Sequence, residues 1–118
     1  MVVVAIDSSN IPRFLLTDAN GVLQTFIPGI NIATSGNVAV GVASTNVLAA
    51  NANRRFAVFV NDSAAIIYLF FGTPAVLNQG IRLNALGGAY EINQTCLYTG
   101  QVTAIATAVG SNLTVTEG

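Results

Sequence analysis

Residues 54–72 (RRFAVFVNDSAAIIYLFFG) constrain the fold of this chain more than any other stretch. Two apolar runs of strand-forming residues flank a short Asn-Asp-Ser turn, and this pattern predicts a β-hairpin. In the second run both sets of alternating positions are apolar: Ile66, Tyr68 and Phe70 on one face, and Ile67, Leu69 and Phe71 on the other. A strand with two apolar faces is normally covered on both of them. We therefore expect a second layer of this chain, or another subunit, to cover the outer face.

The chain beyond residue 36 consists of short strand-forming segments separated by Gly, Asn, Asp and Ser, and it carries almost no helical signal. We predict strands near residues 38–43, 46–50, 55–61, 65–71, 79–83, 88–93, 101–107 and 112–116. Such spacing is typical of an antiparallel β-sandwich or a flattened barrel. We therefore predict a single all-β domain over residues 37–118.

The first 36 residues differ from the rest, because they are apolar but interrupted by proline and by a strong turn signal. Pro12 favours an extended or turn conformation at the residue before it. The dipeptide Asn20-Gly21 supplies the positive φ angles of a tight turn between the apolar segments 13–17 and 22–27. We predict that residues 1–36 form an extended N-terminal arm that contains this small hairpin.

The composition indicates a protein that buries much of its surface against other protein. Of the residues, 53% are apolar and only 8% are charged, whereas about 25% of the residues in an ordinary soluble domain are charged. A membrane span does not explain this deficit, because the longest apolar run, residues 64–71, is far shorter than the ~20 residues of a spanning helix. The favoured cause is extensive burial against other protein, either in an obligate oligomer or on a larger assembly. For a homo-oligomer we expect a trimer in preference to a dimer.

The sequence lacks the residues on which most catalytic and metal sites depend. There is no histidine, and the single cysteine, Cys96, excludes an internal disulfide and a site built on several thiolates. We expect Cys96 to be a small buried apolar side chain, with an intermolecular disulfide as the alternative. The five carboxylates are scattered along the chain. We therefore predict a protein that is not an enzyme and that uses no cofactor or metal.

The charged residues also bear on partners and location. The net charge is −1, lysine is absent, and four arginines are too few for a phosphate-binding patch, so nucleic acid is not an expected partner. No positively charged segment precedes the apolar residues 2–6, so we expect synthesis in the cytoplasm. Arg54 and Arg55 are interpreted as the polar edge of the hairpin, and Arg82 as a cross-strand partner of Glu91. Three Asn-X-Ser/Thr triplets, at 61–63, 93–95 and 112–114, are interpreted as turn and strand-end residues.

Seven short segments between residues 47 and 117 form a recognisable order and spacing. They are VLAANANRRF (47–56), VNDS (60–63), IYLFFG (67–72), GIRL (80–83), GGAYEI (87–92), YTG (98–100) and LTVTE (113–117). In this order and spacing, about 60% of the chain resembles a type of small β-rich structural protein of tailed bacteriophages. The pattern consists of strands and turns, so no functional residues are carried over from the family.

The resemblance implies a virion component without enzymatic activity, most simply a capsid decoration (cement) protein on the outer capsid surface of a virion. Its partner would be the major capsid protein, contacted by an arm that adds strands to exposed sheet edges. The candidate contact residues of the arm are Val3, Ile6, Phe14, Leu16, Phe26 and Ile27. The candidate residues for the core or a subunit interface are Phe59, Ile67, Leu69 and Phe71. A tail or head-fibre attachment component and a small carbohydrate-binding module are the alternatives.

Overall fold

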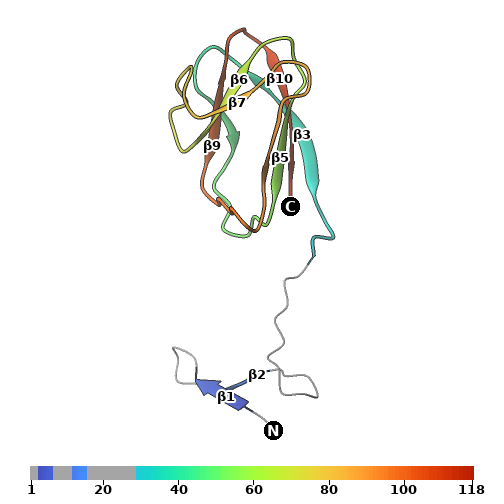
Figure 1. Cartoon of the computed structure of the whole chain (residues 1–118), viewed down its shortest axis with the longest axis vertical. Coiled ribbons are helices and arrows are strands. Elements are labelled where there is room, and N and C mark those ends of the chain that lie inside the picture. Colours follow the sequence, from blue (N-terminus) through green and yellow to red (C-terminus); the bar gives the residue numbers. More distant parts are fainter. Residues whose placement is uncertain (1–2, 7–11, 16–28) are drawn as a thin grey trace.

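The computed structural model describes residues 3–6, 12–15 and 29–118. Residues 29–118 contain two antiparallel sheets of four strands each, which confirms the all-β sandwich prediction (Figure 1). The eight strands are β3 (Thr34–Val40), β4 (Thr45–Leu48), β5 (Ala57–Asn61), β6 (Ile67–Phe71), β7 (Ile81–Leu83), β8 (Ala89–Ile92), β9 (Val102–Ala106) and β10 (Ser111–Glu117). Each overlaps one of the eight segments predicted from the sequence.

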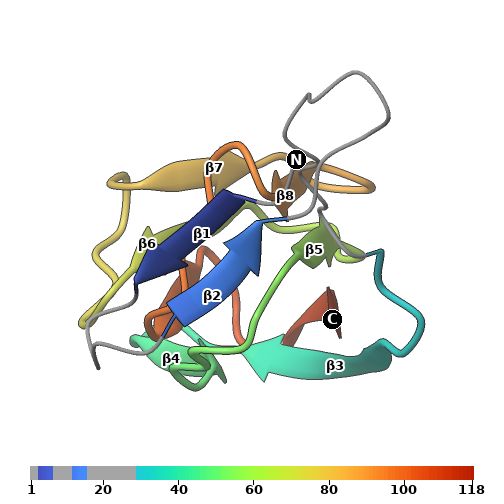
Figure 2. The ribbon, with the colours of Figure 1, turned by 90° about the horizontal axis from the view of Figure 1, so that it is seen from below.

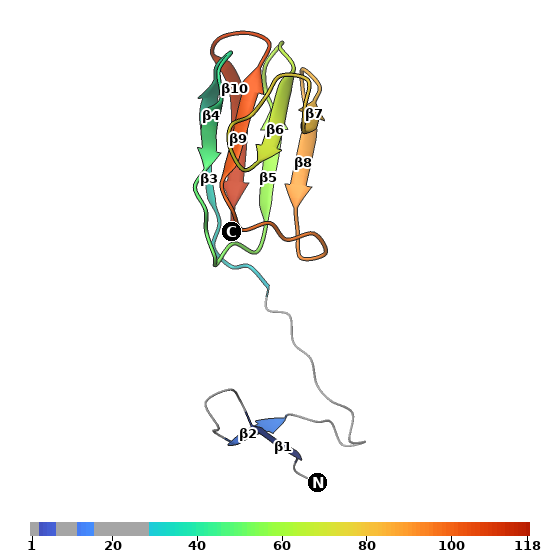
Figure 3. The same cartoon turned by 90° about the vertical axis from the view of Figure 1, so that its left-hand side faces the viewer.

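The chain crosses from one sheet to the other at every connection except the one between β6 and β7. One sheet has the order β3-β10-β5-β8 and the other the order β4-β9-β6-β7 (Figure 3). Along the chain the strand pairs are therefore nested: β3 pairs with β10, β4 with β9, β5 with β8 and β6 with β7. This nested order is that of a double-sheet jelly roll. Seen along the sandwich, β3 lies at one edge and β7 and β8 lie at the opposite edge (Figure 2).

The core lies between the sheets and follows from alternation along the strands. In β10, Ser111, Leu113 and Val115 are buried, whereas the residues between them are only partly buried, as expected for a one-sided strand. β9 is different, because all five of its residues are buried. Buried apolar side chains of both sheets meet in one cluster formed by Val40, Val47, Ala57, Phe59, Ile67, Leu69, Leu83, Ile92, Val102, Ala104, Ala106, Leu113 and Val115.

The prediction that residues 54–72 form a hairpin is wrong. β5 and β6 do not pair with each other, because β5 belongs to the first sheet and β6 to the second. The connection between them is an arch held by the buried side chain of Asn61. Its Nδ2 donates hydrogen bonds to the carbonyls of Ala65 (2.7 Å) and Leu83 (3.1 Å), and its Oδ1 accepts from the backbone N and the Oγ of Ser63. The Asn-Asp-Ser turn therefore directs the chain across the sandwich instead of back along the same sheet.

A segment of the same chain covers the outer face of β6. Tyr68 of β6 and Ile105 of β9 pack with Ala75, and Ile66 and Phe70 lie against them. Hydrogen bonds hold this segment in place: Tyr68 Oη donates to Asn78 Oδ1 (2.9 Å), Ala75 N donates to Ser44 Oγ (2.8 Å), and Thr103 Oγ1 donates to the carbonyl of Gly72 (2.7 Å). The sequence left open whether this chain or another subunit covers the outer face, and in the structure a segment of the same chain covers it.

The described part of the first 28 residues consists of two short strands. β1 (Val3–Ile6) pairs antiparallel with β2 (Pro12–Leu15), with Val3 opposite Leu15 and Ile6 opposite Pro12. The sequence instead predicted that residues 13–17 pair with residues 22–27. The second of these segments, and the Asn20-Gly21 turn, lie outside the described residues.

Two predictions about individual side chains are also wrong. Arg82 lies on β7 and Glu91 on β8, which belong to different sheets, and Arg82 Nε donates instead to Asn84 Oδ1 (3.0 Å). Cys96 is exposed, not buried. It ends a surface turn in which Asn93 Oδ1 accepts from the backbone N and the Oγ1 of Thr95, and its own N donates to the carbonyl of Asn93. The turn chemistry of residues 93–95 therefore decides its position.

Candidate association surfaces

The four residues predicted for the core or for an interface lie in the core. Phe59, Ile67 and Leu69 are fully buried between the sheets. Phe71 is partly buried, and its ring stacks on that of Tyr98 with a centroid distance of 4.4 Å and meets the ring of Tyr90 edge-on at 5.9 Å. Such aromatic pairs add to the stability that burial provides. These side chains hold the two sheets together and are not available to a partner.

Three of the six predicted contact residues of the arm lie in described strands, and the other three lie outside the described residues. Val3 and Ile6 lie in β1, and Phe14 lies in β2. Leu16, Phe26 and Ile27 lie outside the described residues. The backbone from residue 29 to residue 33 then leads into β3 at the end of the sandwich where β10 also ends (Figure 1). We call this end the base, and the opposite end the tip.

A buried arginine organises the base. Arg54 is 1% exposed, and its guanidinium donates to three backbone carbonyls: Nη1 to Tyr98 (3.0 Å) and Gly100 (2.9 Å), and Nη2 to Ala49 (2.7 Å). Its Nε donates to Glu117 Oε2 at 2.5 Å. The side chain thus joins two base loops, residues 49–56 and 93–101, to the end of β10.

Backbone hydrogen bonds complete this unit. Arg55 N and Phe56 N both donate to the carbonyl of Gly118, Gly118 N donates to the carbonyl of Phe56, and Asn51 N donates to the carbonyl of Thr99. In the described part of the chain, no buried side-chain polar atom lacks a hydrogen-bond partner. Hydrogen bonds thus connect the two base loops and the end of β10, and the buried polar side chains among them are satisfied.

The sequence did not single out the role of Arg54, although it favoured a structural role for the Arg54-Arg55 pair. Nothing in the local pattern separates the two arginines, but Arg54 is buried and Arg55 is exposed. The partners of Arg54 lie 44 to 63 residues away, apart from Ala49. Only a contact between distant segments distinguishes them.

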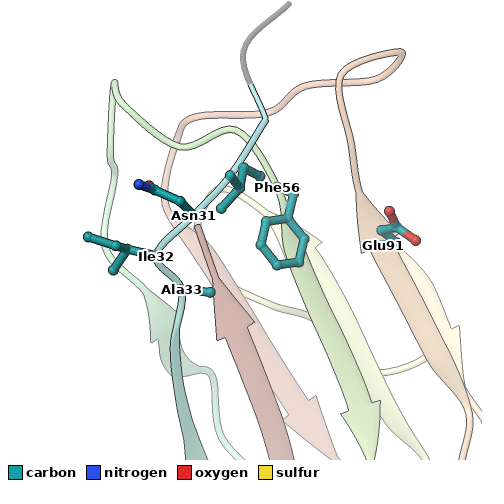
Figure 4. A pocket seen from close by; sticks show the side chains of 6 residues that line it. Asn31, Ile32, Ala33, Phe56 and Glu91 are labelled. Carbon is teal, nitrogen blue, oxygen red and sulfur yellow. The ribbon is translucent and has the colours of Figure 1, made fainter.

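A hollow of about 480 Å³ lies at the base, beside the segment that leads to the arm (Figure 4). It is lined by Ile30, Asn31, Ile32, Ala33, Phe56 and Glu91. Ile32 is 77% exposed and Ile30 is 40% exposed, so large apolar side chains lie open to solvent here. Glu91 supplies the one charge in the lining. The hollow suits an apolar side chain of a partner that carries a positive charge nearby.

A smaller groove of about 190 Å³ runs along the edge of the sandwich between β3 and β4. Its apolar lining residues are Val38, Val47, Leu48 and Val115, and residues 34–37 and Glu117 complete the lining. The groove lies directly beside the outer edge of β3, which in the described part of the chain pairs only with β10.

The tip also exposes apolar side chains. Val42, Leu86 and Val109 project from three different connections, β3–β4, β7–β8 and β9–β10, and are 57%, 81% and 80% exposed. Asp62 is the charged residue of the neighbouring β5–β6 connection. Exposed apolar side chains thus lie at both ends of the sandwich.

The described residues contain no group of three or more His, Cys, Asp or Glu side chains that could hold a metal ion. Within the same ranges, no helix has the length and apolarity needed to cross a membrane. Comparison with protein-family models, with curated proteins and with solved structures gives no match.

Proposed function

We propose that this chain is a non-enzymatic structural protein of a bacteriophage virion, a capsid decoration protein that self-associates and joins neighbouring major capsid subunits. The observation that carries the proposal is the distribution of exposed apolar side chains on the sandwich of a chain in which only 8% of the residues are charged. An isolated monomer would expose these surfaces to water, and burial against other protein is the simplest way to cover them.

The fold agrees with this function without deciding it. Double-sheet jelly rolls serve as capsid domains, but also as lectin domains and cupins, so the fold alone carries no function. A lectin would normally present exposed aromatic rings to sugars. In residues 29–118 every Phe and Tyr is buried or partly buried, so the sandwich favours a structural role over carbohydrate binding.

Attachment would use the arm and the base together. The arm would contact the capsid through Phe14, Leu16, Phe26 and Ile27, and through Val3 and Ile6 in β1, by strand addition and apolar burial at about 25 cal/mol per Å². The base, held by Arg54, would transmit this attachment to the sandwich. Many copies on one shell would bind by avidity, so each contact can be weak.

Removal of the arm tests the proposal. β3 begins at Thr34, so deletion of residues 1–28 removes most of the arm and leaves the sandwich intact. We expect the truncated chain to keep its β-sheet circular dichroism and to lose co-sedimentation with capsid shells. A variant in the sandwich, Arg55→Ala, serves as a control that should still bind.

The location on the virion distinguishes decoration from the alternative of tail or head-fibre attachment. Electron microscopy of virions with a tag fused after Gly118 should show density over the capsid lattice. Density confined to the tail or to a single vertex would contradict the decoration role, and retained binding by the truncated chain would contradict the role of the arm.

A further inference from the structure

The outer edge of β3 differs from the three other sheet edges of the sandwich. β7 has three residues and contains Arg82, β8 has four residues and contains Glu91, and β4 has four residues with a register shift against β9. Short length, charge and irregular register are the devices by which proteins prevent a sheet edge from pairing with another chain. These three edges are therefore protected.

β3 has none of these devices. It is seven residues long (TSGNVAV), it contains no charged residue and no proline, and its register with β10 is regular over its whole length. Residues 34–37 are exposed. Its outer row of backbone N–H and C=O groups is a ready template for another strand.

The groove beside β3 supplies the second requirement for strand addition, a place for alternate side chains. A strand added to β3 would direct every second side chain toward the space between the sheets, over Val38, Val47 and Leu48. Gly36 leaves this space open, because a Cβ atom at its position would meet nothing within 4 Å. Apart from Glu117, the lining of the groove is uncharged, so it suits a strand with apolar side chains.

We infer that the edge of β3 receives the β1 segment, Val3–Ile6, of a second copy of this chain. β1 is uncharged and rich in β-branched residues, as the groove requires. In the described residues it pairs only with the four residues of β2, and a two-stranded hairpin of this size is marginally stable by itself. The described residues thus contain a marginally stable strand pair, β1–β2, and one sheet edge without protection, that of β3, and strand addition would stabilise the first by covering the second.

The connecting chain is long enough for such an exchange. Residues 16–33 connect the β1–β2 pair to β3 and would span up to about 60 Å if fully extended at ~3.3 Å per residue. Because each copy both gives and receives a strand, the exchange would close into a ring such as a trimer, or into a dimer. This exchange replaces the capsid contact proposed above for Val3 and Ile6 with a contact to a neighbouring copy, and it leaves Phe14, Leu16, Phe26 and Ile27 for the capsid.

Disulfide trapping between two differently substituted copies tests the exchange directly. In a Cys96→Ser background, full-length Val4→Cys protein is mixed with full-length Gly36→Cys protein and oxidised. We expect a covalent dimer in the mixture in excess over either protein alone. Because a disulfide needs Cα atoms about 4.4–6.8 Å apart, the trial is repeated with Val3→Cys and Ile6→Cys to cover the registers.

Ala89→Cys, on the protected edge β8 of the same sheet, is the matched control for Gly36→Cys, and it should give no excess dimer. Equal trapping at both edges, or no trapping at any β1 position, would overturn the inference. Dimers of Gly36→Cys alone in excess would indicate direct β3–β3 pairing instead. An intramolecular disulfide in a monomeric Val4→Cys/Gly36→Cys double variant would show that β1 folds back onto its own chain.

A second measurement avoids covalent trapping. Gly36→Lys places a charge in the groove at a site with room for it, and Ala89→Lys places the same charge on the control edge. We expect Gly36→Lys to raise the concentration at which the oligomer half-dissociates by about tenfold or more, and Ala89→Lys to change it little. An unchanged oligomer with Gly36→Lys would contradict the inference. Both measurements use protein without shells, so their failure leaves the capsid proposal untouched.

Discussion

Arg54 shows how one side chain can hold a surface together from within. A buried guanidinium is costly unless its donors are satisfied, and here Glu117 and three carbonyls satisfy it. The flat, forked geometry of arginine suits several acceptors at once, and a lysine could not reproduce it. The residue therefore acts as a structural link between β10 and two base loops.

Replacement of Arg54 should be among the most damaging changes in the chain. Arg54→Ala leaves three carbonyls and a carboxylate without their partner, so we expect a loss of about 3–5 kcal/mol in the free energy of unfolding, measured by urea denaturation. Arg54→Lys should recover only part of that loss. Arg55→Ala, at the exposed neighbour, should stay within about 0.5 kcal/mol of the parent chain. Equal effects at the two positions would contradict the role assigned to Arg54.

Gly80 and Gly110 form a matched pair, since both have positive φ angles, of 85° and 70°. A Cβ atom at Gly80 would run into the carbonyl oxygen of Leu69, whereas a Cβ atom at Gly110 would meet nothing within 4 Å. We expect Gly110→Ala to cost about 1–2 kcal/mol of stability, the cost of a left-handed conformation. Gly80→Ala should cost clearly more in the same thermal unfolding experiment. Similar losses would show that the β6–β7 connection moves to accept the methyl group.

At the scale of the element, the arch between β5 and β6 sets the topology. Asn61 satisfies four hydrogen bonds at the point where the chain leaves one sheet for the other. A hairpin would need no such buried amide, because its turn would lie at the surface. The segment 72–80 then packs on the outer face of β6, so both apolar faces of this strand are covered by residues of the same chain.

Asn61→Asp tests the arch by removing its two donors and burying a negative charge. We expect a loss of about 2–4 kcal/mol of stability, because the carbonyls of Ala65 and Leu83 lose their donor and a carboxylate replaces a neutral group. Asn93→Asp is the control, since Asn93 accepts bonds in an exposed turn and a carboxylate can still accept them. It should change the free energy of unfolding by less than about 1 kcal/mol. A small effect at Asn61 would mean that the arch does not depend on its side chain.

At the scale of the whole molecule, nested pairing makes the jelly roll dependent on distant contacts. β3 pairs with β10 and β4 pairs with β9, so in each sheet the first and last strands along the chain must meet before that sheet is complete. Contacts of this kind are slow to form because loops must close first. The same arrangement leaves β3 at an outer edge, where a neighbouring copy can reach it.

Self-association should be measurable in dilute solution. We expect light scattering of the purified full-length chain at micromolar concentration to give a mass that is a multiple of 12.1 kDa, with a trimer favoured. The physical reason is the exposure of Ile32, Leu86 and Val109, which few charged residues offset. A stable monomer at these concentrations would contradict the argument from composition.

The sequence by itself determined where the strands lie and that their residues alternate between two faces. Alternation is a local property, so Phe59, Ile67 and Leu69 were recognisable as residues of the core or of a subunit interface, and the one-sided pattern of β10 indicated a strand with one face toward solvent. Turn residues likewise marked the ends of the strands. The all-β sandwich followed from these local signals.

Only the tertiary structure decided which strands pair and what covers them. The same alternation satisfies a hairpin and an arch, so residues 54–72 were assigned the wrong connection, and Arg82 was given a partner in the other sheet. Arg54 depends on contacts with residues as far away as Glu117, and the exposure of Cys96 depends on where its loop emerges. Contacts between distant segments decide which strands pair and which polar groups are buried. No local sequence pattern contains those contacts.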